Sequence, residues 1–153
     1  MQQSNPPSQL GDHLGFWLRF VSNQVSDQFR KQVEAQGVTV SEWVALRQLY
    51  EGEGHSVAEL VDRLGMTKGA ISKVLDRLEA KGMLRRVEAT EDRRLLRLEL
   101  LPAGRALVPV LAALADANDA HYFSSLSEED RHHLLRILQS IVHHHHLRRL
   151  PLD

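Results

Sequence analysis

The stretch that most constrains the fold is TKGAISKVLDRLEAKG, which runs from Thr67 to Gly82. Its apolar residues recur every three or four positions, as on one face of an amphipathic helix: Ala70, Ile71, Val74, Leu75 and Leu78. Thr67 is a suitable N-cap, and Gly82 stands where helices often end in a left-handed residue. The face left free carries Lys68, Ser72, Lys73 and Arg77. The sequence therefore predicts a short helix with one buried side and one basic side.

Other elements lie on both sides of this helix. Ser56 and Glu59 form a predicted capping box, and the helix they open ends at Gly65, so that only Gly-Met-Thr joins it to the basic helix. Downstream, 83–87 and the alternating residues 96–100 predict two strands of a hairpin. We therefore expect a mainly α fold with a small β-hairpin wing. Residues 39–101, from the capping box of Thr39 and Glu42 onward, form its winged helix-turn-helix.

Long helices are predicted on either side of the winged helix. Apolar residues follow the helical period through residues 10–36, and two further helices are expected within 102–150. Pro102 suits the first turn of one, and Ser127 caps the other. Their apolar stripes are longer than a small winged-helix lobe can cover. Residues 1–9, rich in Gln, Ser and Pro, are expected to form a flexible tail.

Charge is unevenly distributed along the chain, although the net charge is only −1. Residues 56–101 hold ten Lys or Arg against eight Asp or Glu, whereas both flanking segments are net acidic. This asymmetry favours a region that faces a polyanion. The absence of Cys excludes disulfides, thiolate metal sites and thiol redox sensing. Because no signal peptide or apolar run of about 18 residues is visible, we expect a soluble cytoplasmic protein.

The basic helix suits the major groove of double-stranded DNA. A recognition helix buries one side and offers short side chains near its N-terminus, where it approaches the bases. Thr67, Gly69 and Ser72 meet that need. The longer cations, Lys68, Lys73 and Arg77, are predicted to reach flanking phosphates, which position the protein without reading sequence.

Three stretches taken together resemble the MarR-type transcriptional regulators. They are VTVSEWVALRQL, TKGAISKVLDRLEAKGML and EDRRLLRLELLPAGRAL, and the resemblance extends from about residue 10 to the last helix. It implies a wing tip in which Asp92 orients Arg94 into the minor groove while Arg93 meets the backbone. The chain departs from the family pattern in having Glu42 for Gln, Ala89-Thr90 for Asp-Pro, and Pro102 for Thr.

The resemblance also implies how such a protein works. It predicts a repressor that binds a pseudo-palindromic operator as a homodimer, through its flanking helices, and is released by a small aromatic or phenolic effector. His13 and Trp17, near the start of the first long helix, are the candidate effector contacts; packing at the dimer interface is their alternative role. Trp43 stands at a core position of the family and is expected to pack inside.

Two alternative functions remain open from the residues alone. The run His143–His146, with ligands such as His121, His132 or His133, would suit a metal-responsive regulator, although only His143 and His146 would share a helical face. A winged helix can also be a protein-interaction module, but that function calls for exposed apolar residues on the recognition face. The sequence contains no His-Glu-x-x-His, Gly-x-Ser-x-Gly or Walker motif, so no enzyme, catalytic residue, cofactor or membrane partner is predicted.

Overall fold

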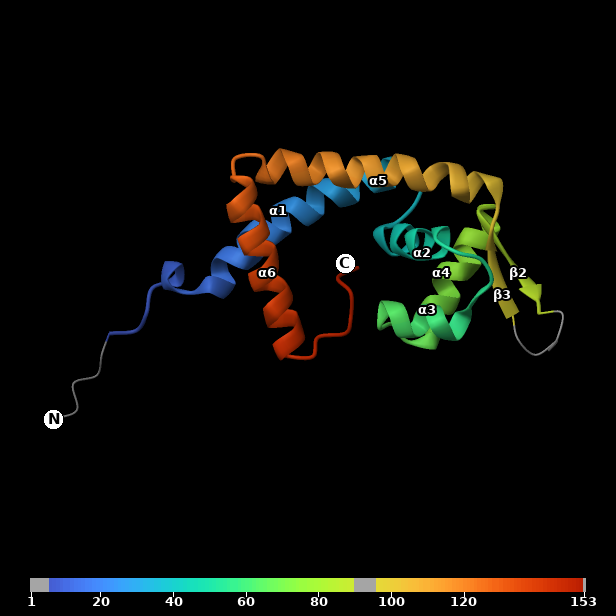
Figure 1. Ribbon diagram of the computed structural model, residues 1–153, viewed down its shortest axis with the longest axis horizontal. Helices are drawn as coiled ribbons and strands as arrows, with labels where there is room; N and C mark the ends of the chain where they lie inside the picture. Colours follow the sequence, from blue (N-terminus) through green and yellow to red (C-terminus); the bar gives the residue numbers. More distant parts are fainter. Residues whose placement is uncertain (1–5, 90–95, 153) are drawn as a thin grey trace.

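A computed structural model describes residues 6–89 and 96–152, and within them the chain is mainly helical (Figure 1). The long helices are α1 (Leu14–Ala35), α5 (Pro102–Phe123) and α6 (Glu128–His144), and a short 3-10 helix (Leu10–Asp12) precedes α1. The intervening elements are α2 (Val40–Tyr50), β1 (His55–Ser56), α3 (Val57–Leu64), α4 (Lys68–Ala80), β2 (Leu84–Glu88) and β3 (Leu96–Leu100). The predicted winged helix-turn-helix with flanking helices is confirmed.

Two groups of elements meet along α5 (Figure 1). α5 packs lengthwise on α1 and also contacts α2 and β3, so it joins the flanking helices to the winged-helix lobe. The core lies mainly in that lobe, where α2, α3 and α4 bury residues such as Leu46, Leu64 and Leu75. Trp43 packs against this core as a partly buried residue, as expected. By contrast, every residue of α6 is exposed in the protomer.

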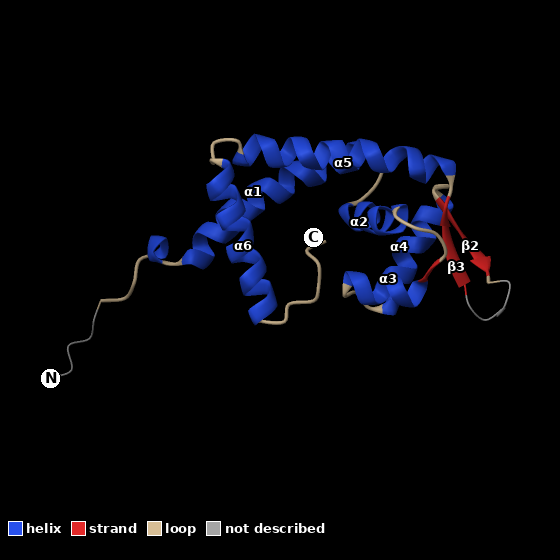
Figure 2. Cartoon of the chain, viewed as in Figure 1, coloured by secondary structure: helices blue, strands red, loops and turns tan. Residues whose placement is uncertain are grey.

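Within the described residues the sheet has three strands, ordered β1-β3-β2, rather than the predicted two (Figure 2). The hairpin strands pair antiparallel, with Leu84 opposite Leu100, and β2 begins one residue later than expected. The third strand, β1, pairs His55 with Leu98 and Ser56 with Arg97. A two-residue strand is too short to show an alternating pattern, which explains why the sequence did not reveal it.

Local capping fixes the ends of the short helices as predicted. The hydroxyl of Thr39 accepts a hydrogen bond from the Glu42 amide at 3.2 Å, and the Thr39 amide donates to the Glu42 carboxylate at 2.9 Å. Ser56 caps α3 in the same reciprocal way, and Thr67 caps α4 through the Ala70 amide. α3 then ends at Gly65, whose φ of 61° is favourable for glycine.

The Glu42 carboxylate connects α2 to α4 inside the lobe. Its side chain has no exposed surface, yet each oxygen has a cationic partner from α4 or its C-cap. Arg77 Nε donates to Oε1 at 2.9 Å, and Lys81 Nζ donates to Oε2 at 2.7 Å. Lys81 also donates to the Gly37 carbonyl oxygen at 2.8 Å. One carboxylate thus holds the start of α2 against the C-terminal half of α4.

The protonation of Glu42 is set by opposing effects. Burial alone would raise its pKa, but hydrogen bonds from Lys81, the Thr39 amide and Arg77 outweigh that effect, and the pKa lies below its usual value of 4.5. A lowered pKa means that the folded state favours the charged carboxylate. The stabilisation is therefore present above about pH 4.5 and is lost as the pH falls through the lower folded pKa.

We expect Glu42→Gln to lower the free energy of unfolding by about 1–3 kcal/mol at pH 7, because two cations lose their buried acceptor charge but can turn toward water. Urea unfolding at several pH values measures this effect. The difference from wild type should shrink below about pH 4.5. Glu34→Gln, which removes an exposed partner of Arg30, is the matched control and should change stability little. A pH-independent difference would contradict the assignment.

Candidate DNA-binding surface

The recognition helix α4 has a fully buried inner face and an open outer face. Ile71, Val74, Leu75 and Leu78 are at most 2% exposed. On the outer face Thr67, Lys68, Gly69 and Lys73 are exposed, and Ser72 is partly buried. No atom lies within 4 Å of the point where Gly69 would carry a Cβ, so the helix surface there is low and unobstructed. The predicted arrangement of small residues and flanking lysines is therefore present in the fold.

Arg77 lies in a different setting from the other predicted phosphate-binding residues. Although its side chain is 48% exposed, its Nε is held by the buried Glu42 carboxylate. The sequence suggested only an outward cation, because its partner lies 35 residues away along the chain. Arg77 therefore anchors α4 to α2, a structural role that sequence reasoning missed.

Arg86 fastens the wing to the recognition helix. It projects from β2, and its guanidinium donates to Asp76 Oδ1 at 2.8 Å and to Glu79 Oε2 at 2.5 Å. A longer contact of 3.5 Å reaches the Ser72 carbonyl oxygen. Burial acts to lower the pKa of Arg86, but Asp76 and Glu79 outweigh it and raise that pKa. The side chain is only 21% exposed, so its main role is to hold the wing against α4.

A groove runs between α3, α4 and the wing. Its volume is about 480 Å³, and its lining includes Lys68 and Ser72 from α4, Arg86 from β2 and Leu96 from β3. Two of the predicted recognition-helix residues thus share one concave surface with the base of the wing. The predicted wing-tip contacts, Asp92, Arg93 and Arg94, lie outside the described residues.

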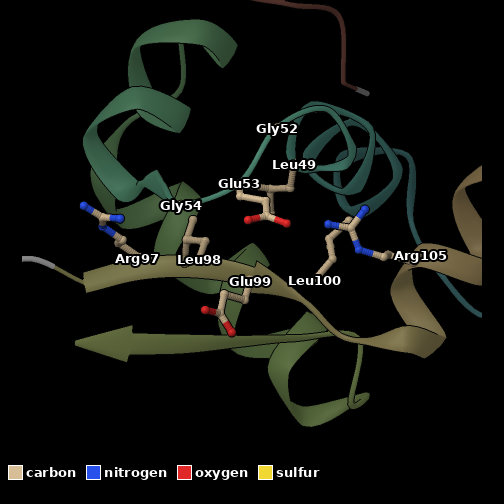
Figure 3. A pocket seen from close by; sticks show the side chains of 9 residues that line it. All are labelled: Leu49, Gly52, Glu53, Gly54, Arg97, Leu98, Glu99, Leu100 and Arg105. Atoms are coloured by element: carbon tan, nitrogen blue, oxygen red, sulfur yellow. The ribbon is translucent and has the colours of Figure 1, made fainter. Parts of the chain in front are cut away.

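A second cavity, of about 420 Å³, lies behind the wing between the α2–β1 loop, β3 and the start of α5 (Figure 3). Figure 3 shows the Glu53 carboxylate between the side chains of Arg97 and Arg105. Glu99, also in the lining, pairs with Arg85 at 2.8 Å. Because charges of both signs line it, this cavity does not resemble a site for an aromatic ligand.

The two candidate effector residues lie at the exposed beginning of α1. His13 is the N-cap residue, and Trp17 is 53% exposed with its indole N–H donating to the Gly11 carbonyl oxygen at 2.9 Å. The ring of Phe16 meets that of Trp17 edge-on, with centroids 5.3 Å apart. In the protomer these residues form part of an exposed apolar surface and not the wall of either cavity described above.

The histidine run adopts a different geometry from the expected helical one. α6 ends at His144, and His146 has a left-handed φ of 52°, so His143 and His146 do not share a helix face. Their ring centroids are 6.5 Å apart. Within residues 6–89 and 96–152, no three His, Asp or Glu side chains gather where they could hold a metal ion. In the same ranges no helix is long and apolar enough to cross a membrane.

Comparison with known proteins identifies the class to which this fold and surface belong. A family model described as MarR family matches residues 36–95. The HTH-type transcriptional repressor Rv2887 of Mycobacterium tuberculosis is 30% identical over 84% of this chain and 92% of its own length. The HTH-type transcriptional repressor MdtR of Bacillus subtilis is 29% identical over 80% of this chain and 79% of its length. The chain belongs to the MarR family of transcriptional regulators.

Solved structures agree with this assignment. CouR from Rhodococcus jostii, bound to p-coumaroyl-CoA, has 26% sequence identity and a TM-score of 0.76, covering 88% of this chain and 95% of its own. Rv2887 in complex with p-aminosalicylic acid has 29% identity and a TM-score of 0.65, covering 84% and 98%. The expected family resemblance is thereby confirmed.

If Arg86 fixes the wing to α4, Arg86→Met should weaken binding to duplex DNA about three- to tenfold. The salt dependence of binding should stay unchanged, because the side chain faces Asp76 and Glu79 and is not one of the proposed phosphate contacts. Fluorescence anisotropy at several salt concentrations measures both quantities. Arg85→Met, which removes an exposed cation from the same strand, is the control. Equal losses for the two variants would contradict the structural role of Arg86.

Proposed function

We propose that this protein is a sequence-specific DNA-binding transcriptional repressor that acts as a homodimer on a pseudo-palindromic operator. The observation that carries the proposal is the exposed basic face of α4 beside the wing, supported from behind by the Glu42 and Arg86 ion pairs. A rigid recognition helix loses little conformational entropy on entering the major groove of DNA. Two relatives are named HTH-type transcriptional repressors, which supports repression over activation.

The proposed contacts divide into base readout and positioning. Thr67, Gly69 and Ser72 approach base edges in the major groove, and Lys68 and Lys73 meet flanking phosphates. Arg77 anchors α4 through its Nε, and the exposed part of its guanidinium is proposed to meet a flanking phosphate. At the wing tip, Asp92 orients Arg94 toward the minor groove and Arg93 contacts the backbone, as the family resemblance implies.

A second copy of this chain is the proposed occupant of the exposed apolar surface on α1 and α6. Residues of both helices leave much apolar area in water, including Leu14 at 82%, Trp17 at 53% and Leu135 at 51% exposed. Exposed apolar area on this scale marks an interaction site. A single winged helix would bind one half-site only weakly, so two recognition helices are needed. Two-fold pairing would place both of them on one face of the duplex.

The proposed regulator is cytoplasmic, has no enzymatic activity and is released by a small aromatic effector. Solved relatives in complex with p-aminosalicylic acid and p-coumaroyl-CoA support an aromatic ligand class. His13 and Trp17 lie on the surface that is proposed to pair with a second protomer. In the dimer their rings would line an effector pocket that the second protomer completes. A ligand that binds better to one spacing of the recognition helices shifts the dimer toward that spacing.

We expect Lys68→Ala with Lys73→Ala to weaken operator binding at least tenfold. The slope of log affinity against log salt should become shallower by about 0.9 for each phosphate that is no longer neutralised. Operators are first obtained by selection from random duplex DNA, and titrations then measure affinity and slope. Lys31→Ala, on α1 and paired with Asp27, is the control. An unchanged slope would favour the protein-interaction alternative.

We expect Ile137→Asp with Ile141→Asp to convert the dimer to a monomer at micromolar concentration. These residues lie one turn apart on α6 and are 47% and 44% exposed, so the change places charge on the proposed interface. Sedimentation velocity measures the outcome, and far-UV circular dichroism checks the fold. His132→Asp, an exposed polar position on the same helix, is the control. A wild-type protein that sediments as a monomer would contradict the dimer proposal.

A further inference from the structure

The last residues of the chain return from α6 to the winged-helix lobe (Figure 1). After α6 ends, the amide of Leu147 donates to the Val142 carbonyl oxygen at 3.0 Å, and His146 adopts its left-handed conformation. This tight turn redirects the chain away from the helix axis. Figure 1 shows the segment that follows, in red, passing from the foot of α6 toward α3. We refer to residues 147–150 as the C-terminal strap.

The strap contacts the helix-turn-helix turn through backbone atoms. The Leu150 amide donates to the Leu64 carbonyl oxygen at 3.4 Å, at the last residue of α3. A Cβ built on Gly65 would lie 2.5 Å from the Arg148 carbonyl oxygen and 2.9 Å from the Arg149 Cα. Such distances are far below van der Waals contact. The turn and the strap can approach this closely only because residue 65 has no side chain.

Leu150 gives the strap an apolar anchor. It is partly buried and packs against the core of the winged-helix lobe, where Leu64 is fully buried. Leu147, earlier in the same segment, is 57% exposed. Leu150 therefore holds the far end of the strap through its side chain and a long hydrogen bond, and the near end of the strap continues directly from α6.

We propose that the C-terminal strap positions the recognition helix relative to α6. Gly65 precedes Thr67, the N-cap of α4, by two residues, so a displaced turn moves the end of α4 that faces DNA. α6 carries much of the apolar surface assigned to the dimer. The strap is then a further connection between α6 and the recognition helix, in addition to α5 and to the contact of α1 with α2. This inference rests on the proposed function, and Gly65 and Leu150 are its positioning residues.

The contact itself is tested without DNA, by a thermodynamic cycle that combines Gly65→Ala with removal of residues 147–153. Gly65→Ala should lower the urea midpoint more than Gly82→Ala does. Both glycines have a positive φ, of 61° and 69°, but a Cβ on Gly82 would meet no atom within 4 Å. In the shortened chain the two substitutions should lower the midpoint equally. If Gly65→Ala still lowered the urea midpoint more than Gly82→Ala in the shortened chain, the proposed contact would be overturned.

The positioning role is tested with Leu150→Ala, which keeps Arg148 and Arg149 in place. We expect a three- to tenfold loss of affinity for a duplex carrying two half-sites, with an unchanged salt slope and an unchanged sedimentation coefficient. Leu147→Ala, an equal truncation at an exposed position of the strap, should retain wild-type affinity. Wild-type affinity of Leu150→Ala would overturn the positioning role even if the cycle shows the contact.

A different result would overturn the proposed function itself. A wild-type chain that binds no duplex, even after selection from random DNA, would overturn both DNA binding and the positioning role. In that case the urea cycle would still report on the strap contact, because its readout does not depend on DNA.

Discussion

The candidate DNA-binding surface depends on the interactions of the buried Glu42 carboxylate. This carboxylate stands at the start of α2 and draws two cations from α4 and its C-cap, so the angle between these helices is fixed by charge as well as by apolar packing. A buried charge is tolerable only when its hydrogen-bonding capacity is filled, as Thr39, Arg77 and Lys81 fill it here. The outer face of α4 can remain basic because the Glu42 contacts and the apolar core already hold the helix in place. Lys68 and Lys73 are exposed on that face, which suits them to the proposed phosphate contacts.

The wing is tied to the same helix from the other side. Arg86 reaches two acidic residues of α4, and β1 adds a third strand that joins the wing to the start of α3. Helix α4 is thus attached to α2 at its C-terminal end and to β2 along its flank. This arrangement explains how a small lobe can present a helix and a hairpin as one unit. In the proposed mechanism, that rigidity lets a change in dimer geometry move α4 and the wing together.

Sequence patterns predicted what depends on neighbouring residues. The capping boxes at Thr39 and Ser56, the N-cap Thr67 and the apolar stripe of α4 all follow from local rules, and all are present. Long-range partnerships were not predictable in this way. Nothing local indicated that Arg77 pairs with Glu42, that β1 joins the sheet, or that the end of the chain lies against Gly65. The histidine run also differed, because α6 ends within it and His146 turns left-handed.

The unpartnered surface of α1 and α6 has a consequence for how such a regulator responds to its own abundance. Each protomer leaves large side chains such as Trp17 and Leu135 in water, so in the proposed dimer folding and association form one linked equilibrium. The concentration of dimer then varies as the square of the free protomer concentration, and dilution also lowers the thermal midpoint. Where total protein lies near the dimer dissociation constant, a modest fall in synthesis would therefore free an operator more sharply than the fall in total protein suggests.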